Sequence, residues 1–261
     1  MDPVRAKKQL GQHFLTDLTI ARRICEALTG FAARETLEVG PGMGVLTQYL
    51  LERDDLDLHA AEVDRESVDY LIERWPAFAP RIIHGDFLRL PLRQMFPGGV
   101  NIIGNFPYNI SSQIFFKVLE NRDLVSECVG MVQKEVAVRI AEKPGTRDYG
   151  ILSVFLQAYY DIEYLFTVNE NVFSPPPKVK SAVIRLTRNG RQSLGCDEKL
   201  FAKTVKGAFG QRRKTLRNSL RATFPEIGDR THDFFTLRPE RLSVEEFVEL
   251  TLFVEKCIND R

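Results

Sequence analysis

The chain has 261 residues, enough for one large domain and a small one, and its apolar fraction of 44% is ordinary for a globular protein. Its 36 basic and 35 acidic side chains leave a formal net charge of +1, which excludes a uniformly basic or acidic protein. No apolar run approaches a membrane span, no signal-peptide core opens the chain, and the four cysteines are scattered without a C-x-x-C pair. These features predict a cytoplasmic protein without disulfides, a metal site or a membrane segment.

The chain begins with a basic arm that carries Arg5, Lys7 and Lys8 and continues into residues 9–15. A helix is predicted from about residue 18 to 28, because Thr16 or Asp17 can cap its start, apolar residues recur at helical spacing, and Gly30 can end it. A single histidine ahead of such a helix, here His13, is more often structural than a ligand.

A glycine-rich turn follows the next predicted segment, a strand at residues 36–39. The turn is Gly40-Pro41-Gly42-Met43-Gly44, and a helix is expected through residues 45–50. Such a turn lets a ligand approach the backbone and the N-terminus of the helix. NAD binding is the obvious alternative, but the spacing is G-x-G-x-G rather than the G-x-G-x-x-G of dinucleotide-binding proteins.

Polar side chains also follow the next predicted strands. Glu62 lies near the end of a strand at residues 58–63 and can accept both hydroxyls of a ribose, which fits any adenosine-containing cofactor. Asp86 follows a short strand at residues 82–83 and can accept from an adenine amine. Each acid alone is more simply a solvated loop charge. Together with the glycine turn and the amide described next, they favour a ligand site along one edge of a parallel sheet.

The motif Asn105-Phe106-Pro107-Tyr108 follows an apolar run at residues 100–104 and precedes a helix for which Ser111 is the expected N-cap. Asn105 offers an acceptor oxygen, Pro107 restricts Phe106 to extended conformations and so directs its carbonyl, and Tyr108 offers a flat face. Two fixed acceptors beside an aromatic ring suit the exocyclic amine of a planar base such as adenine. A simple Asn-x-Pro turn is the alternative for the tetrapeptide alone.

The second half of the chain continues the sheet and then changes character. Strands are predicted at residues 127–132, 162–168 and 181–187, the last two as a hairpin, with a helix at residues 151–160. Near Asn189 the strand pattern stops, so we predict a Rossmann-like domain at residues 1–190 and a helical domain at residues 191–261, which ends in an amphipathic helix at residues 244–258.

A basic stretch spans this boundary. Residues 171–224 hold thirteen Lys or Arg against two acids, Asp197 and Glu198. A basic run is usually a solvated face, but the length of this run, next to an adenine-shaped pocket, points to phosphate contacts. Five of its cations are expected on one helix: Arg212, Arg213, Lys214, Arg217 and Arg221.

The motifs together resemble the ribosomal RNA adenine N6-dimethyltransferases, a family of Rossmann-like S-adenosylmethionine-dependent methyltransferases, over almost the whole chain. Within that family, Pro175-Pro176-Pro177-Lys178-Val179 and residues 211–220 resemble the small-subunit enzymes linked to kasugamycin sensitivity. Many members carry Asn where His13 stands and Leu or Ile where Phe106 stands. The matching segments are Gln12–Leu15, Glu38–Gly42, Asn105–Ser111, Gln133–Ala137, Phe173–Val179 and Gln211–Leu220.

The resemblance implies an α/β methyltransferase sheet with a small all-helical C-terminal domain, and S-adenosylmethionine as cofactor. The implied cofactor residues are His13, Leu15, Gly40, Glu62, Asp86 and Asn105. The target adenine would enter beside residues 105–108, with Phe173 as the second stacking face or else as an ordinary core residue. The implied RNA contacts are Lys178, Arg212, Arg213, Lys214 and Arg217.

The activity implied is dimethylation of N6 on two adjacent adenines near the 3′ end of small-subunit ribosomal RNA, by a monomer that acts on the immature small subunit. Two alternatives stay open at this point. One is the large-subunit methyltransferase class that confers macrolide resistance, against which the long motif at residues 211–220 counts. The other is a non-catalytic RNA-binding assembly factor, against which the intact strand-end residues count.

Overall fold

The computed structural model describes residues 7, 10–30 and 33–260, so Arg5, Lys8 and Gln9 of the predicted basic arm lie outside the described residues. The chain separates into two compact units, Met1–Ala137 with Asp161–Arg188, and Val138–Tyr160 with Asn189–Arg261. The second unit therefore includes residues 138–160, which the sequence analysis counted with the first domain.

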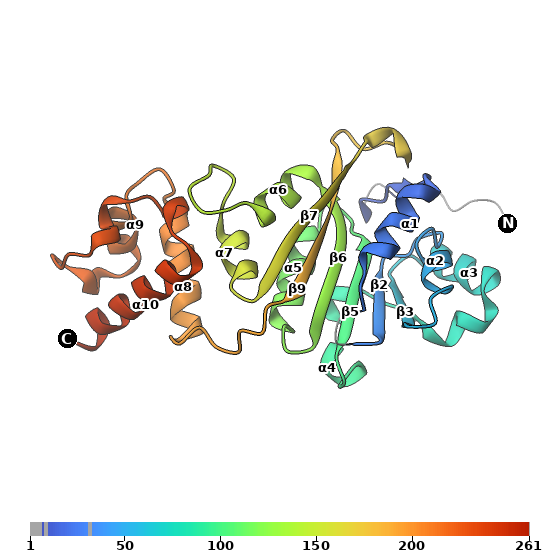
Figure 1. The fold of residues 1–261 in the computed structure, drawn as a ribbon, viewed down its shortest axis with the longest axis horizontal. Coiled ribbons are helices and arrows are strands. Elements are labelled where there is room, and N and C mark those ends of the chain that lie inside the picture. The colour runs from blue at the N-terminus through green and yellow to red at the C-terminus, as the bar shows by residue number, and fades with distance from the viewer. Residues whose placement is uncertain (1–6, 8–9, 31–32, 261) are drawn as a thin grey trace. The chain divides into compact units, whose positions relative to one another are not determined.

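A seven-stranded sheet organises the first unit, with the strand order β4-β3-β2-β5-β6-β9-β7 (Figure 1). β2 pairs in parallel with β3 and β5, β3 with β4, and β5 with β6, whereas β6 and β9 are antiparallel. The strands are β2 (Glu35–Val39), β3 (Asp57–Glu62), β4 (Ile82–His84), β5 (Val100–Asn105), β6 (Val125–Gln133), β7 (Tyr160–Val168) and β9 (Ser181–Arg188).

The strand order reverses between β2 and β5. From β2 the chain moves outward to β3 and β4, then returns to the other side of β2 for β5 and β6. In an open parallel sheet this arrangement leaves a crevice at the carboxyl ends of the strands, where ligands bind. The predicted α/β Rossmann-like fold is confirmed, and both ends of every predicted strand agree with the observed ones to within two residues.

Among the described residues of the first unit there are five α-helices, and a sixth, α6, crosses the unit boundary at Ala137. Asp17 caps α1 by accepting from the amides of Thr19 at 2.8 Å and Ile20 at 3.1 Å, as one of the two predicted caps. The helices are α1 (Leu18–Ala27), α2 (Thr47–Leu50), α3 (Arg65–Arg74), α4 (Leu92–Met95), α5 (Ser111–Glu120) and α6 (Lys134–Ala141).

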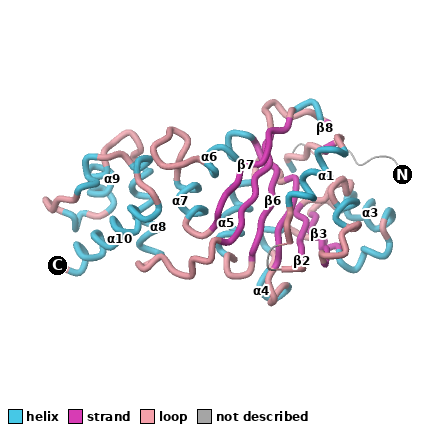
Figure 2. The backbone as a smooth tube through the Cα atoms, viewed as in Figure 1, coloured by secondary structure: helices cyan, strands magenta, loops and turns pink. Residues whose placement is uncertain are grey.

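The region of the second unit after Asn189 is helix and loop (Figure 2). Ser243 and Glu246 form a capping box at the start of α10, which the apolar pattern predicted. The helices of this unit are α7 (Ile151–Gln157), α8 (Glu198–Gly210), α9 (Leu216–Thr223) and α10 (Val244–Asn259). Short 3-10 helices in the two units lie at Pro76–Arg81, Phe87–Arg89, Glu170–Val172, Pro225–Ile227, Asp233–Thr236 and Pro239–Arg241.

Three local predictions are corrected. α2 begins at Thr47, because the glycine turn continues through residue 46, and Ile110 rather than Ser111 is the N-cap of α5. The five cations do not share a helix: α8 ends at Gly210, Arg212 to Lys214 lie in a turn closed by the Lys214 amide on the Gln211 carbonyl at 2.8 Å, and α9 carries the remaining two.

Two glycines make room for the residues that follow β5. A Cβ atom on Gly104 would lie 2.5 Å from the Val39 carbonyl oxygen, and one on Gly130 would lie 2.4 Å from Cε2 of Phe106. The Phe106 ring is fully buried and meets Phe115 edge to face at 5.8 Å. This packing anchors the chain immediately after Asn105 and turns the Phe106 side chain into the core.

A two-residue ladder supplements the sheet, in which β1 (Phe14–Leu15) pairs antiparallel with β8 (Phe173–Ser174). Among the residues that the structure describes, no helix is both long enough and apolar enough to span a membrane.

Candidate active site

A cavity of about 260 Å³ opens at the carboxyl ends of β2, β3 and β5, where the strand order reverses. Its walls come from residues 10–15, the glycine turn, the ends of the strands and residues 105–110. The structure brings the predicted cofactor residues together here, since all six line the cavity: His13, Leu15, Gly40, Glu62, Asp86 and Asn105.

The glycine turn adopts a backbone that other residues resist. Gly40, Gly42 and Gly44 have φ values of +68°, +55° and +78°, all in the left-handed region. A Cβ on Gly42 would also lie 2.9 Å from the Phe14 ring, and one on Gly44 would lie 2.4 Å from Trp75. Glycine at positions 40 and 42 lets the backbone itself form part of the cavity wall.

Glu62 holds the glycine turn and the end of β3 together. Its carboxylate accepts from the Gly42 amide at 3.0 Å and from the Asp64 amide at 2.9 Å, one bond to each oxygen. The residue is 4% exposed, and burial raises the pKa of the carboxyl above its usual value. Each oxygen keeps acceptor capacity, so this side chain can still take hydroxyl groups from a ligand in the cavity.

Glu38 is a cavity residue that the sequence analysis did not single out. It is 1% exposed and accepts from the Thr47 hydroxyl at 2.6 Å. Burial raises the pKa of this carboxyl to about 8, with the neighbouring Glu62 acting in the same direction. A glutamate within the apolar strand Thr36-Leu37-Glu38-Val39 was the available signal, since a charge there must be paired or protonated.

Asp86 is less enclosed, with a side chain about 40% exposed. It caps the short helix at Phe87–Arg89 by accepting from the Leu88 amide at 3.0 Å. One carboxylate oxygen is engaged in this way, and for the other the described residues offer only the guanidinium of Arg89, at 3.7 Å. It is therefore open to a further donor.

Asn105 is oriented by a bond to the backbone. Its Nδ2 donates to the His13 carbonyl oxygen at 3.0 Å, and this acceptor fixes which end of the amide is nitrogen. The Oδ1 atom is thereby left as the acceptor. Since the Phe106 ring is fully buried, only the backbone of that residue can take part in the cavity.

Tyr108 is held at both its hydroxyl and its ring. The hydroxyl makes a short hydrogen bond with the Ser181 hydroxyl, and burial raises the pKa of the phenol. The ring stacks on the His13 imidazole, with centroids 5.4 Å apart and planes 28° apart, and His13 Nδ1 lies 2.8 Å from the Pro175 carbonyl oxygen. The His13 side chain is thus engaged with Tyr108 and the proline segment.

The N-terminal segment, Leu10 to Leu15, is tied to the cavity at several points. Lys7 ahead of it pairs with Asp64 at 2.5 Å and with Glu66 at 3.1 Å. A Cβ on Gly11 would lie 2.6 Å from the Asn109 side-chain oxygen, so the N-terminal segment is in close contact with the chain that follows Tyr108. No local sequence pattern pointed to the pairing of Lys7 with Asp64 or of Tyr108 with Ser181, because the partners lie 57 and 73 residues apart in the chain.

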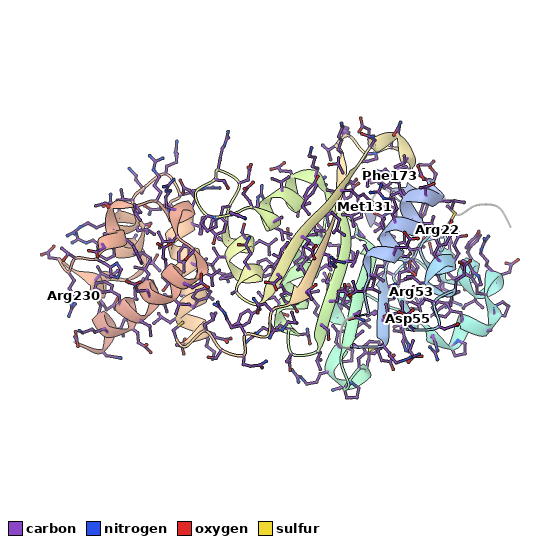
Figure 3. All side chains as sticks on the ribbon, viewed as in Figure 1. Arg22, Arg53, Asp55, Met131, Phe173 and Arg230 are labelled. Carbon is purple, nitrogen blue, oxygen red and sulfur yellow. The ribbon has the colours of Figure 1, made fainter. Side chains whose placement is uncertain are left out.

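The structure does not bring Phe173 to the cavity. It is 4% exposed and belongs to a buried cluster that includes Leu15 and Met131, and Figure 3 labels both Phe173 and Met131. The pairing of β8 with β1 places it opposite Leu15. The structure therefore gives Phe173 a buried position beside the cavity residue Leu15, and its role as the second stacking face stays a prediction.

The predicted RNA contacts differ in their surroundings. Arg212 donates to the Tyr149 carbonyl at 2.9 Å and to that of Arg147, and lies 3.9 Å from Glu240. Arg213 and Lys214 are exposed, Arg217 is half-buried on α9, and Lys178 is exposed in the loop before β9. Arg212 is thus hydrogen-bonded within its own unit, whereas Arg213 and Lys214 are exposed to solvent.

The described part of the chain holds no group of three or more His, Cys, Asp or Glu side chains that could bind a metal ion.

A mostly parallel sheet with a glycine turn after one strand and a buried glutamate after the next defines a Rossmann-like S-adenosylmethionine-dependent methyltransferase. The comparisons with known proteins agree: the family model described as ribosomal RNA adenine dimethylase matches residues 4–258. The chain belongs to this family.

Individual relatives are consistent with this assignment. A Parabacteroides distasonis protein named ribosomal RNA small subunit methyltransferase A is 59% identical over 257 residues, 97% of this chain and 95% of the relative. The crystal structure of a dimethyladenosine transferase from Plasmodium falciparum has a TM-score of 0.79 at 23% identity, covering 94% and 98% of the two chains. That of the 23S rRNA methyltransferase ErmE has a TM-score of 0.65 at 26% identity, covering 90% and 98%.

Proposed function

We propose that the protein transfers methyl groups from S-adenosylmethionine to N6 of two adjacent adenines near the 3′ end of small-subunit ribosomal RNA. One observation supports this most directly: Asn105 presents a fixed amide acceptor, next to the Phe106 backbone and Tyr108, in the cavity that holds the predicted cofactor residues. Family membership supplies the base and the kind of RNA.

The polar groups that line the cavity fit S-adenosylmethionine, which supplies an electrophilic methyl group on a sulfonium. Glu62 would accept from the ribose hydroxyls, Asp86 from the adenine amine, and the turn at Gly40 would lie against the methionine end. Leu15 and the other apolar side chains would cover the faces of the cofactor. The 4% exposure of Glu62 keeps water from competing for its oxygens.

The substrate side would act by positioning. The N6 lone pair of adenine is delocalised into the ring, so the amine is a poor nucleophile. Hydrogen bonds from the amine to Asn105 Oδ1 and to the Phe106 carbonyl would favour a more tetrahedral nitrogen with its lone pair directed at the methyl group. The nitrogen becomes acidic only as the methyl arrives, so no strong base is needed for the proton.

Tyr108 would stack on the target base, which must leave its own helical stack to enter the cavity. Ser181 and His13 fix the plane of that ring by the hydroxyl bond and the stacking contact described above. These two contacts hold Tyr108 as one face of the base site, and Phe173 stays the candidate for the second face.

The small subunit is favoured over the large one as target. The relative at 59% identity carries the small-subunit name, whereas the 23S rRNA methyltransferase is 26% identical. A non-catalytic assembly factor is disfavoured because Glu62, Asp86 and Asn105 all line the cavity.

The proposal includes the immature small subunit as substrate, a monomeric enzyme, a cytoplasmic location and a role in small-subunit biogenesis.

The deciding experiment supplies labelled S-adenosylmethionine and unmethylated small or large ribosomal subunits, followed by mass spectrometry of RNA fragments. Dimethyladenine at two adjacent positions of small-subunit RNA alone is expected. Labelling of large-subunit RNA, or no labelling of either, would overturn the assignment. Asn105→Ala serves as the inactive control.

A further inference from the structure

Gln133 is the last residue of β6 and begins the motif Gln133–Ala137, which has no part in the site described above. β5 and β6 run in parallel, and Asn105 is aligned with Met131. Gln133 comes two residues later and therefore extends about 7 Å beyond the level of Asn105. It lies at the same carboxyl edge of the sheet as the cavity.

The side chain of Gln133 lies on the face of the sheet that carries Phe173. Side chains alternate along a strand, so Gln133 shares a face with Met131. Met131, labelled with Phe173 in Figure 3, belongs to the buried cluster that contains Phe173 and Leu15. Gln133 thus extends that face toward the candidate second stacking residue of the base site.

The cross-strand neighbour of Gln133 is Ser181, which holds the tyrosine of the base site. The two residues are directly opposite in the antiparallel pairing of β6 with β9, so their Cβ atoms lie about 5 Å apart on one face. The Ser181 hydroxyl makes the short hydrogen bond with the Tyr108 hydroxyl. The Lys134 amide donates to the Lys180 carbonyl oxygen at 2.9 Å, so the pairing of the two chains continues past Gln133. The Gln133 amide therefore lies beside the hydroxyl end of Tyr108.

This amide is available to a ligand. Gln133 is half-buried, and among the described residues its side chain has no hydrogen-bond partner. Ser181, by contrast, is fully buried and its hydroxyl is engaged with Tyr108. A half-buried amide has lost part of its hydration, so a hydrogen bond to a bound group is favoured there.

The target adenine offers one kind of polar atom to this amide. Its two N6 hydrogens would be taken by Asn105 Oδ1 and the Phe106 carbonyl, which leaves the ring nitrogens as acceptors. N1 and N7 flank the amine, and Gln133 Nε2 is a donor that matches either of them. Two hydrogen bonds to the same nitrogen leave the ring freer to pivot about that atom than a further bond at a ring nitrogen does. A donor here would therefore align the amine with the methyl group.

We propose that Gln133 is a further base-contacting residue, whose Nε2 donates to the ring nitrogen that flanks the amine of the target adenine. The inference rests on the proposed function, since it takes adenine as the base beside Asn105 and Tyr108. It adds a contact to the base edge, whereas Tyr108 contributes a stacking face.

The test measures single-turnover methylation of small subunits whose two target adenines are replaced, through a ligated synthetic RNA segment, by 1-deazaadenine or by 7-deazaadenine. Each analogue exchanges one ring nitrogen for a C–H group. At least one of them should slow the wild-type protein by about two- to tenfold, the effect of one hydrogen bond between neutral groups. Gln133→Met and Gln133→Glu keep an unbranched side chain without the donor. Both should slow methylation of ordinary adenine by a similar factor and lose the sensitivity to that analogue.

Gln94→Met is the matched control, because it removes an exposed amide on α4, ahead of the amino end of β5. It should keep the wild-type rate and the wild-type sensitivity to both analogues. Affinity for S-adenosylmethionine and the thermal midpoint should be unchanged in all three variants.

A wild-type protein that methylates both analogues at the rate of adenine would overturn the inference, and this measurement needs no variant. So would a folded Gln133→Met protein that keeps the wild-type rate or the wild-type sensitivity. Failure of the proposed function would instead appear as absent methylation of ordinary adenine in small-subunit RNA by the wild-type protein.

Discussion

Replacing Glu62 with Gln changes a carboxylate at which two backbone amides already point. The Gly42 amide donates to one oxygen at 3.0 Å and the Asp64 amide to the other at 2.9 Å. A Gln side chain has a single acceptor oxygen, so in either orientation its NH2 group faces one of these N–H donors. The remaining oxygen must serve a backbone amide and the ribose together.

The expected loss of cofactor affinity follows from the ribose contact. A hydrogen bond to a charged group contributes about 1.5–3 kcal/mol, and one between neutral groups about 0.5–1.5 kcal/mol. The difference of about 1.4 kcal/mol corresponds to a roughly tenfold rise in Kd. Glu62→Ala, which removes both acceptors, should weaken binding further.

Calorimetric titration with S-adenosylmethionine measures this directly, with Glu52→Gln as a charge-matched control on an exposed side chain. Because burial raises the pKa of Glu62, its protonated fraction grows sooner as the pH falls than for an exposed glutamate. Wild-type affinity should therefore decline toward that of Glu62→Gln at acidic pH. Unchanged affinity in a folded Glu62→Gln protein would refute the ribose assignment.

Four further outcomes are expected. Asn105→Ala should lower kcat about a hundredfold in single-turnover assays while subunit binding persists; near-normal turnover would mean that something else orients the amine. Glu38 keeps its proton in the folded protein up to a pKa of about 8, whereas the unfolded chain releases it near 4.5. The stability of the wild type should therefore fall relative to that of Glu38→Gln as the pH rises from about 5 to 8. If urea unfolding gives free energies that change with pH in the same way in the two proteins, the prediction is wrong. Arg212→Ala should cost about 2 kcal/mol and lower Tm by several degrees through its lost bonds to backbone carbonyls. Changing Arg213 and Lys214 together should flatten the salt dependence of RNA binding without changing Tm. A lower Tm in this double variant together with an unchanged Tm in Arg212→Ala would refute both the RNA-contact and the structural assignment.

Local patterns in the sequence were enough to predict the sheet and the edge on which the site lies. Strand periodicity, glycine spacing and the position of Glu62, Asp86 and Asn105 after successive strands depend on neighbouring residues, and parallel strands bring their carboxyl ends together. The basic stretch after Asn171 was equally visible in the composition, although its division between a turn and two helices was not.

Tertiary packing decided which side chains face the site and which are held elsewhere. Phe173 lies in the core because β8 pairs with β1, about 160 residues earlier in the chain, and His13 faces Tyr108 and Pro175 for the same reason. Arg212 is held by carbonyls at residues 147 and 149, whereas Arg213 and Lys214 beside it are exposed. A side chain's partners are set by segments distant in sequence, and helical or strand periodicity carries no information about them.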